Sequence, residues 1–312
     1  MGLQSELMHS ALNVKYSVAG LSFDEIRGFY SAFIRIAARK VDWGCVVRWT
    51  PTKFFEFVRE MARISINNNI ECGRTENDVR NILNRNSIYH EMLCLAKDVY
   101  GCGSKELEGG WKTVYPPSEL VLNDYRTGLK SRLYRRDNYG GVEYAYALAG
   151  TNPMSIVDWE NNILQLGGES AQYIQSAKNA VLIANMARAA NAKLFFTGHS
   201  LGGGLASFCA LATKQRAIVF NPAGVSEDTM ARLREKPCQR DYDAFIEGFY
   251  ATNDILNLFQ DASQRTEGMR LVFPPAIGRR YYVKSGCLSP IMSHTMSRMV
   301  ECVNAAQGLS AG

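Results

Sequence analysis

Residues 194–206, LFFTGHSLGGGLA, give the strongest indication of the fold class. This stretch begins as an apolar run that favours a β-strand, passes through Gly-x-Ser-x-Gly, and ends in small residues that suit a closely packed helix. A serine at such a strand-to-helix turn has a strained backbone, and small neighbours such as Gly198 and Gly202 let the strand and helix approach. The motif predicts a nucleophile elbow at Ser200, preceded by His199.

The same turn predicts where an oxyanion would be stabilised. The helix that follows Ser200 points its N-terminal N–H groups toward the serine, so the amide of Leu201 is expected to be one donor. The second donor is expected to be Thr151, after an early strand whose end at Gly150 allows close approach of the backbone. An ordinary strand-end turn with a helix-capping threonine is the alternative for Thr151.

The order of elements around the elbow predicts an α/β-hydrolase fold. A period-two pattern at residues 129–135 and 142–149 indicates a β-hairpin. Beyond it, apolar strands and amphipathic helices alternate, a pattern typical of a mostly parallel sheet covered on both faces.

Upstream of the hairpin the chain is expected to be mainly helical. We expect residues 1–110 to form a helical extension or cap and residues 111–312 to form the catalytic region. Amphipathic helices are predicted at residues 23–38, 52–64 and 87–100, with a polar loop at residues 67–73.

Composition excludes several classes of function. The chain has 312 residues, 46% of them hydrophobic, and a net charge of +5 with mixed signs, too weak to indicate nucleic-acid binding. No run of 18 apolar residues predicts a transmembrane segment. The Gly-rich run lacks the Gly-Lys-Ser/Thr of a phosphate loop. No His, Cys or carboxylate cluster with ligand spacing is evident, so neither a metal nor a cofactor is expected.

The cysteines are scattered and suggest a reduced protein. The sequence has 8 cysteines and no C-x-x-C pair. Mostly buried thiols are expected, with Cys94 and Cys209 in helical apolar stripes. An isolated disulfide between Cys72 and Cys102 stays an alternative.

Ser200 needs a base, and chain order selects His294. In this fold the order is serine, then acid, then histidine. Of the four histidines, His9 and His90 precede the elbow, and His199 is expected to point away from Ser200. A helix-capping or core histidine is the alternative for His294.

The acid that orients the histidine should follow a strand beyond the elbow. Asp254 follows the C-terminal end of the apolar strand predicted at residues 244–251, after two polar residues. Asp241 and Asp243 precede that strand, and Asp261 lies further along the chain. Asp254 is therefore the predicted acid, with these three as rivals.

Four stretches of the chain together carry a family resemblance. They are Leu148-Ala149-Gly150-Thr151 with Asp158-Trp159 downstream, residues 197–203, Asn253-Asp254, and Ser293-His294. In these stretches the chain resembles the class 3 lipases, the fungal triacylglycerol-lipase-like group of α/β-hydrolases. It departs from them at Ala149, where the family usually has arginine, a change that bears on strand packing more than on catalysis.

The resemblance implies cleavage of carboxylic esters in lipids at a membrane or micelle surface. It also implies a mobile lid, which we expect at residues 153–167, although a plain connecting helix suits the same residues. Two alternatives stay open: an esterase or thioesterase for soluble substrates, and a non-catalytic lipase-like scaffold.

Residues 217–224 and the long helical region look like those of bacterial members of the superfamily, including type VI secretion lipase effectors. The first 19 residues lack the pattern of a Sec signal, so synthesis in the cytoplasm without that signal is expected. The resemblance to effectors implies export by a type VI system to the periplasm of a target cell. A cognate immunity protein would then be a partner, and neighbouring genes would reveal it.

Overall fold

The computed structural model describes residues 51–101, 107–138, 140–150, 171–235, 237–266, 273–287 and 289–309. The strands are β1 Lys112–Thr113, β2 Asn123–Asp124, β3 Leu129–Asn138, β4 Gly141–Leu148, β5 Lys193–His199, β6 Arg216–Phe220, β7 Ile246–Ala251 and β8 Arg279–Val283. The helices are α3 Pro51–Arg85, α4 Ile88–Asp98, the 3₁₀ turn η2 Glu108–Gly110, α6 Ala171–Ala189, α7 Leu201–Thr213, α8 Glu227–Met230, α9 Gln239–Phe245, α10 Ile255–Arg265, α11 Pro290–Ser293 and α12 Met296–Gln307.

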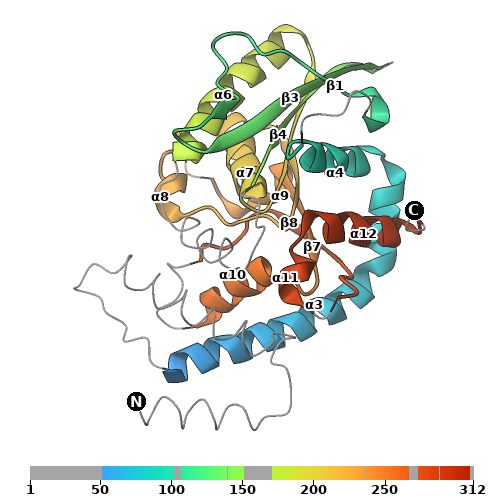
Figure 1. The fold of residues 1–312 in the computed structure, drawn as a ribbon, viewed down its shortest axis with the longest axis vertical. Coiled ribbons are helices and arrows are strands. Elements are labelled where there is room, and N and C mark those ends of the chain that lie inside the picture. Colours follow the sequence, from blue (N-terminus) through green and yellow to red (C-terminus); the bar gives the residue numbers. More distant parts are fainter. Residues whose placement is uncertain are drawn as a thin grey trace, which may run out of the picture.

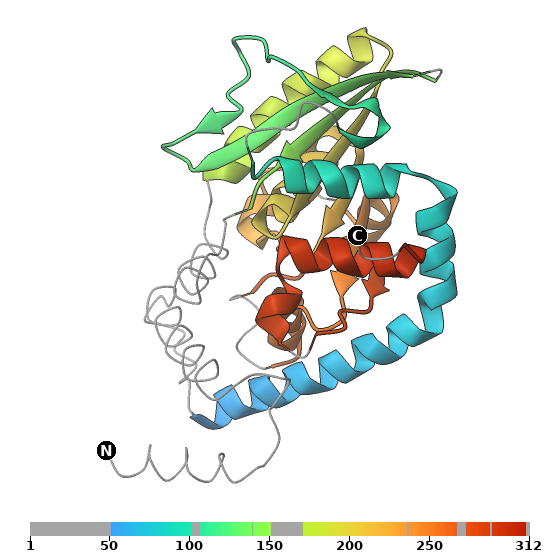
Figure 2. The same ribbon diagram turned by 45° about the vertical axis from the view of Figure 1, so that its right-hand side comes forward.

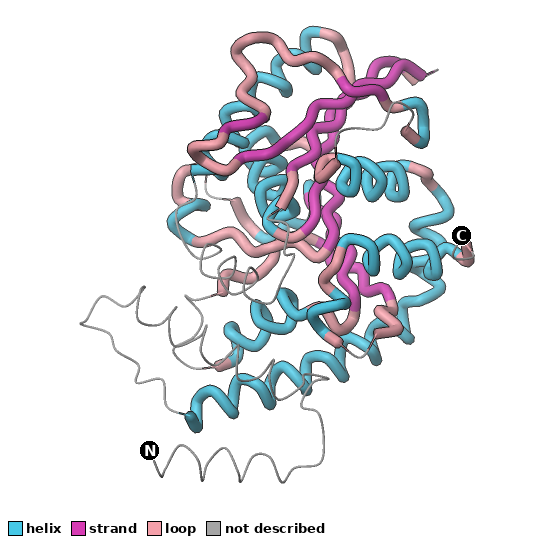
Figure 3. The backbone as a smooth tube through the Cα atoms, viewed as in Figure 1, coloured by secondary structure: helices cyan, strands magenta, loops and turns pink. Residues whose placement is uncertain are grey.

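In the described part of the chain the strands form one sheet in the order β1-β3-β4-β5-β6-β7-β8, with β2 also paired to β3. From β4 to β8 all neighbours are parallel, whereas β3 is antiparallel to β1, β2 and β4. Figure 3 shows these strands running through the middle of the molecule between helices. The predicted α/β fold with a mostly parallel sheet is confirmed, and so is the β3–β4 hairpin.

Both faces of the sheet are buried, because successive side chains of a strand point to opposite faces. In β6, Ala217 and Val219 face one core, whereas Ile218 and Phe220 face the other. Helices α6 and α7 cover the first face, and α4 and α12 cover the second (Figure 1). Strands buried on both sides read as continuous apolar runs, and this explains the sequence pattern.

Helix α3 corrects one expectation. The polar loop predicted at residues 67–73 is wrong, because α3 continues through it to Arg85 (Figure 2). A buried stripe at helical spacing, which includes Met61, Asn68 and Cys72, packs α3 toward α10, β8 and α12. This packing outweighs the cost of about 1 kcal/mol for Gly73 within a helix. The helix predicted at residues 87–100 is confirmed by α4, and that at residues 23–38 lies outside the described residues.

The division of the chain at residue 110 stays a prediction. Helix α4 lies before that boundary, yet Met92 and Leu93 belong to the same core as the sheet residues Ala145 and Phe220. The Met92 carbonyl also accepts a hydrogen bond from Thr197 Oγ1 on β5, at 3.0 Å. The structure thus places α4 in the layer that covers the sheet.

None of the helices in the described ranges is long and apolar enough to cross a membrane. Cys72 and Cys209 are free, buried thiols. Cys102 lies outside the described residues.

Candidate active site

Ser200 occupies a strained turn between β5 and α7. Its backbone angles are φ 57° and ψ −129°, which a residue other than glycine seldom adopts. A Cβ atom on Gly202 would collide with the carbonyl oxygen of Leu148 on β4, and one on Gly198 would collide with the carbonyl of Gly202. The two glycines therefore let β4, β5 and α7 pack backbone against backbone, as the sequence motif predicts.

A chain of hydrogen bonds joins the three residues predicted to act together. His294 Nε2 lies 2.9 Å from Ser200 Oγ, and His294 Nδ1 lies 2.5 Å from Asp254 Oδ2. Asp254 and His294 are buried, while Ser200 is partly exposed. An ionised carboxylate only accepts hydrogen bonds, so the Nδ1–H of His294 donates to it and Nε2 is left to accept from the serine.

Each of these side chains sits where an element begins or ends. Asp254 follows β7 and caps α10, with its Oδ1 accepting from the amide of Asn257 at 2.7 Å. His294 ends the short helix α11, just before α12. Ser200 and Asp254 both follow the carboxyl ends of parallel strands, where open α/β sheets place their ligand sites.

The rival acids have other partners. Asp261 forms an ion pair with Arg280, at 2.7 Å. Asp241 accepts a hydrogen bond from the amide of Cys238 at the start of α9. Asp243 accepts one from Gln239 Nε2 on the same helix. Of the four candidates, Asp254 is the one hydrogen-bonded to His294.

The ring of His199 packs against that of His294 and makes no hydrogen bond to Ser200 through its buried Nε2. It is buried, and its ring centroid lies 4.9 Å from that of His294, with 39° between the ring planes. Burial and the neighbouring imidazole of His294 hold the pKa of His199 well below its ordinary value. His199 is therefore neutral at physiological pH and adds no charge beside His294.

The end of β4 lies against the elbow. The amide of Gly150 donates to Tyr100 Oη at 2.9 Å, and this hydroxyl donates to the carbonyl of His199 at 3.4 Å. Burial raises the pKa of Tyr100, so it stays a neutral donor.

As the first residue of α7, Leu201 has an amide N–H with no acceptor inside the helix. Thr151, Asp158, Trp159 and the lid predicted at residues 153–167 lie outside the described residues.

Sequence inspection missed Asn221, a buried residue that connects three loops of the site. Its Nδ2 donates to the carbonyl of Ser293 at 3.2 Å, and its Oδ1 accepts from the amide of Ala251 at 2.9 Å. Its φ of 40° lies in the left-handed region, which asparagine tolerates better than most residues. The Asn-Pro pair directly after the buried strand β6 was the available signal.

No separate role was predicted for Asn253 from the sequence. In the structure its side chain is hydrogen-bonded to two other segments of the chain. Its Oδ1 accepts from Ser65 Oγ on α3 at 2.9 Å, and its Nδ2 donates to the carbonyl of Cys287 at 3.4 Å. Helix α3 thereby braces the loop that carries Asp254.

Comparison with known proteins shows that the chain is similar to phospholipases. Over 197 residues the chain is 34% identical to an extracellular phospholipase A1 of Serratia liquefaciens. The match covers 61% of this chain and 57% of that protein's length. Residues 91–294, which include Ser200, Asp254 and His294, match the family described as the Tle-like phospholipase domain. The chain therefore belongs to the family of Tle-like phospholipase domains.

Proposed function

We propose that this protein hydrolyses the acyl ester bonds of phospholipids through Ser200, Asp254 and His294. The observation that carries the proposal is the hydrogen-bonded series from Ser200 Oγ through the His294 ring to Asp254. Serine is a weak nucleophile unless an adjacent base takes its proton, and that base needs an orienting group. Family membership supports phospholipid as the substrate class.

In the proposed mechanism, His294 Nε2 takes the proton of Ser200 as Oγ attacks the acyl carbonyl carbon. Asp254 holds the imidazole in the required tautomer and stabilises the cation. The amide N–H groups of Leu201 and Thr151 stabilise the oxyanion. His294 then gives its proton to the departing lysophospholipid oxygen. Water, deprotonated by His294, hydrolyses the acyl-enzyme and releases a fatty acid.

We propose the sn-1 acyl ester as the preferred bond, on the basis of the relative described as a phospholipase A1. The chain spans 57% of that relative's length, so the position needs its own test. Two phosphatidylcholines that carry a labelled chain at either sn-1 or sn-2 distinguish the two esters. Faster release from the sn-1-labelled lipid is expected, and equal or reversed rates would refute this preference.

The main test measures fatty-acid release from phospholipid vesicles by the wild type and by Ser200→Ala. We expect loss of activity on the order of 10⁶-fold in the variant, because the three groups act as a unit. Release that persists in a folded Ser200→Ala protein would overturn the mechanism. Activity on soluble esters alone would favour a soluble-substrate esterase, and no serine-dependent activity on any ester would favour a scaffold.

We further propose that the enzyme acts outside the cell that makes it, as an antibacterial effector. The resemblance to type VI lipase effectors and the extracellular relative support this proposal. Expression directed to the periplasm of a test bacterium should be toxic, whereas expression of Ser200→Ala should not be. An adjacent gene product that suppresses the toxicity would be the immunity partner. Growth unaffected by active enzyme in the periplasm would contradict the effector role.

A further inference from the structure

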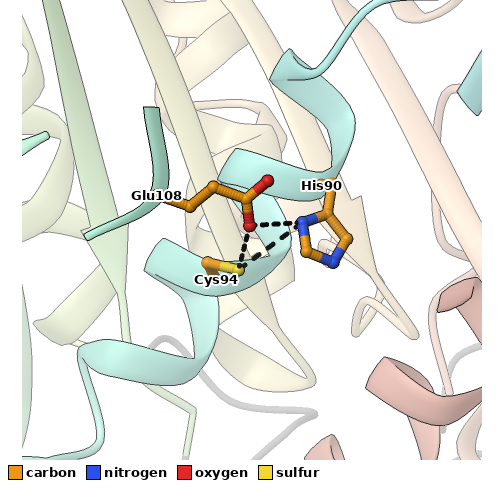
Figure 4. Close-up of side chains that lie close together, drawn as sticks. All are labelled: His90, Cys94 and Glu108. Carbon is orange, nitrogen blue, oxygen red and sulfur yellow. Dashed lines mark hydrogen bonds and ion pairs between the residues drawn. The ribbon is translucent and has the colours of Figure 1, made fainter. Parts of the chain in front are cut away.

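Three side chains of the types that ligate metals meet on the outer side of α4 (Figure 4). His90 and Cys94 lie one helical turn apart on α4, and Glu108 approaches them from η2. Glu108 Oε2 is 2.7 Å from His90 Nδ1 and 3.6 Å from Cys94 Sγ, and the sulfur is 3.8 Å from the same nitrogen. No metal site was expected from the sequence, because only the fold brings Glu108 to the i, i+4 pair of His90 and Cys94.

These separations are close to those of a tetrahedral zinc site. Zinc bond lengths to sulfur, nitrogen and oxygen imply ligand-to-ligand distances of about 3.4–3.6 Å. Both distances from Cys94 Sγ are near that range, and only the separation between His90 and Glu108 must widen. The Glu108 side chain is 50% exposed, so it can move outward without disturbing the core.

His90 is also held in the orientation that a ligand needs. Its Nε2 lies 3.0 Å from Asn304 Oδ1 on α12, so a proton on Nε2 directs the Nδ1 lone pair toward the cluster. Metal-bound histidines usually donate their second ring nitrogen to such an oxygen, which fixes the tautomer and the ring plane.

We propose that His90 Nδ1, Cys94 Sγ and a Glu108 oxygen bind one zinc ion, with water as the fourth ligand. The mixed sulfur, nitrogen and oxygen set suits zinc, whereas Mg²⁺ and Ca²⁺ require oxygen ligands. The partial exposure of Glu108 leaves room for the water. Such an ion would tie η2 to α4, the helix that covers the sheet.

The test titrates the full chain with Zn²⁺ by calorimetry under reducing conditions and records the absorption spectrum after Co²⁺ addition. We expect one ion per chain and a thiolate-to-cobalt charge-transfer band. Cys94→Ser should abolish that band. Asn304→Ala should lower the zinc affinity by about 10–100-fold, and Glu108→Gln should lower it at least as much. Cys238→Ser, at an exposed cysteine, is the matched control and should bind like the wild type.

Circular dichroism of each metal-free variant checks folding, and Glu108→Gln changes a half-exposed side chain whose loss should leave the fold intact. Absence of stoichiometric zinc binding by the wild type would overturn the proposal. So would a charge-transfer band that survives in Cys94→Ser, or zinc affinity unchanged in Glu108→Gln. These outcomes are independent of ester hydrolysis.

Discussion

The rings of His199 and His294 lie against each other, with their centroids 4.9 Å apart. The two histidines have different partners. His294 is hydrogen-bonded to Asp254 and Ser200, whereas burial and the neighbouring imidazole keep His199 neutral. A second cation at this position would oppose the charge that His294 acquires in the proposed mechanism.

A neutral buried histidine predicts a specific pH dependence of stability. Below about pH 6.5, His199 is protonated in the unfolded chain but not in the folded protein. The free energy of unfolding therefore decreases as the pH is lowered. At or above that pH this contribution to stability is fully present. The free energy of unfolding can be measured by denaturant unfolding at several pH values between pH 7 and pH 5. Its decrease per pH unit should be smaller in His199→Phe than in the wild type, by up to about 1.4 kcal/mol per pH unit. Identical slopes would mean that His199 protonates in the folded state.

Asp254→Asn should reduce kcat by about 10⁴-fold, because an amide no longer selects the required tautomer of His294. Asparagine keeps an oxygen that can cap α10 at the amide of Asn257, so stability should change little. Vesicle hydrolysis and thermal unfolding are the measurements. Asp243→Asn, at a rival carboxylate in α9, is the control and should keep wild-type kcat. Comparable activity in the two variants would exclude Asp254 as the orienting acid.

Two glycine-to-alanine substitutions should change stability in opposite directions. Gly202→Ala places a Cβ against the carbonyl of Leu148 on β4 and should lower the free energy of unfolding by about 1–3 kcal/mol. Gly73→Ala meets nothing within 4 Å on an exposed face of α3 and should raise it by about 0.5–1 kcal/mol. Urea unfolding of both variants gives the comparison. A tolerated Gly202→Ala would contradict the close packing of β4 against α7.

Asn221 should act as a positioning residue. Asn221→Ala removes both hydrogen bonds to Ala251 and Ser293, and a buried unpaired group costs about 1–3 kcal/mol. Because Ser293 adjoins His294, kcat should fall by about 10–100-fold with little change in KM. Asn221→Gly accepts the positive φ but lacks the amide, so it should be equally slow and less destabilised. Wild-type kcat in both variants would leave Asn221 with a purely structural role.

Much of the fold could be predicted because its signals are local. The strained turn at Ser200 demands small residues at positions 198 and 202, and strands buried on both faces read as apolar runs. Chain order then selected His294 and Asp254, which the structure brings together with Ser200. For the turn at Ser200 and for the buried strands, the backbone conformation of a few neighbouring residues produces the pattern in the sequence.

Other features depend on contacts between distant parts of the chain and could not be predicted from local patterns. Helix α3 continues through a polar stretch because its stripe packs on α10 and β8, about 200 residues away in sequence. The ring of His199 lies on His294, and Glu108 reaches His90, through folding rather than spacing. Local sterics and periodicity thus specify the strand-turn-helix unit and the order of its partners along the chain. The surroundings of each side chain were decided by long-range packing, which no local pattern encodes.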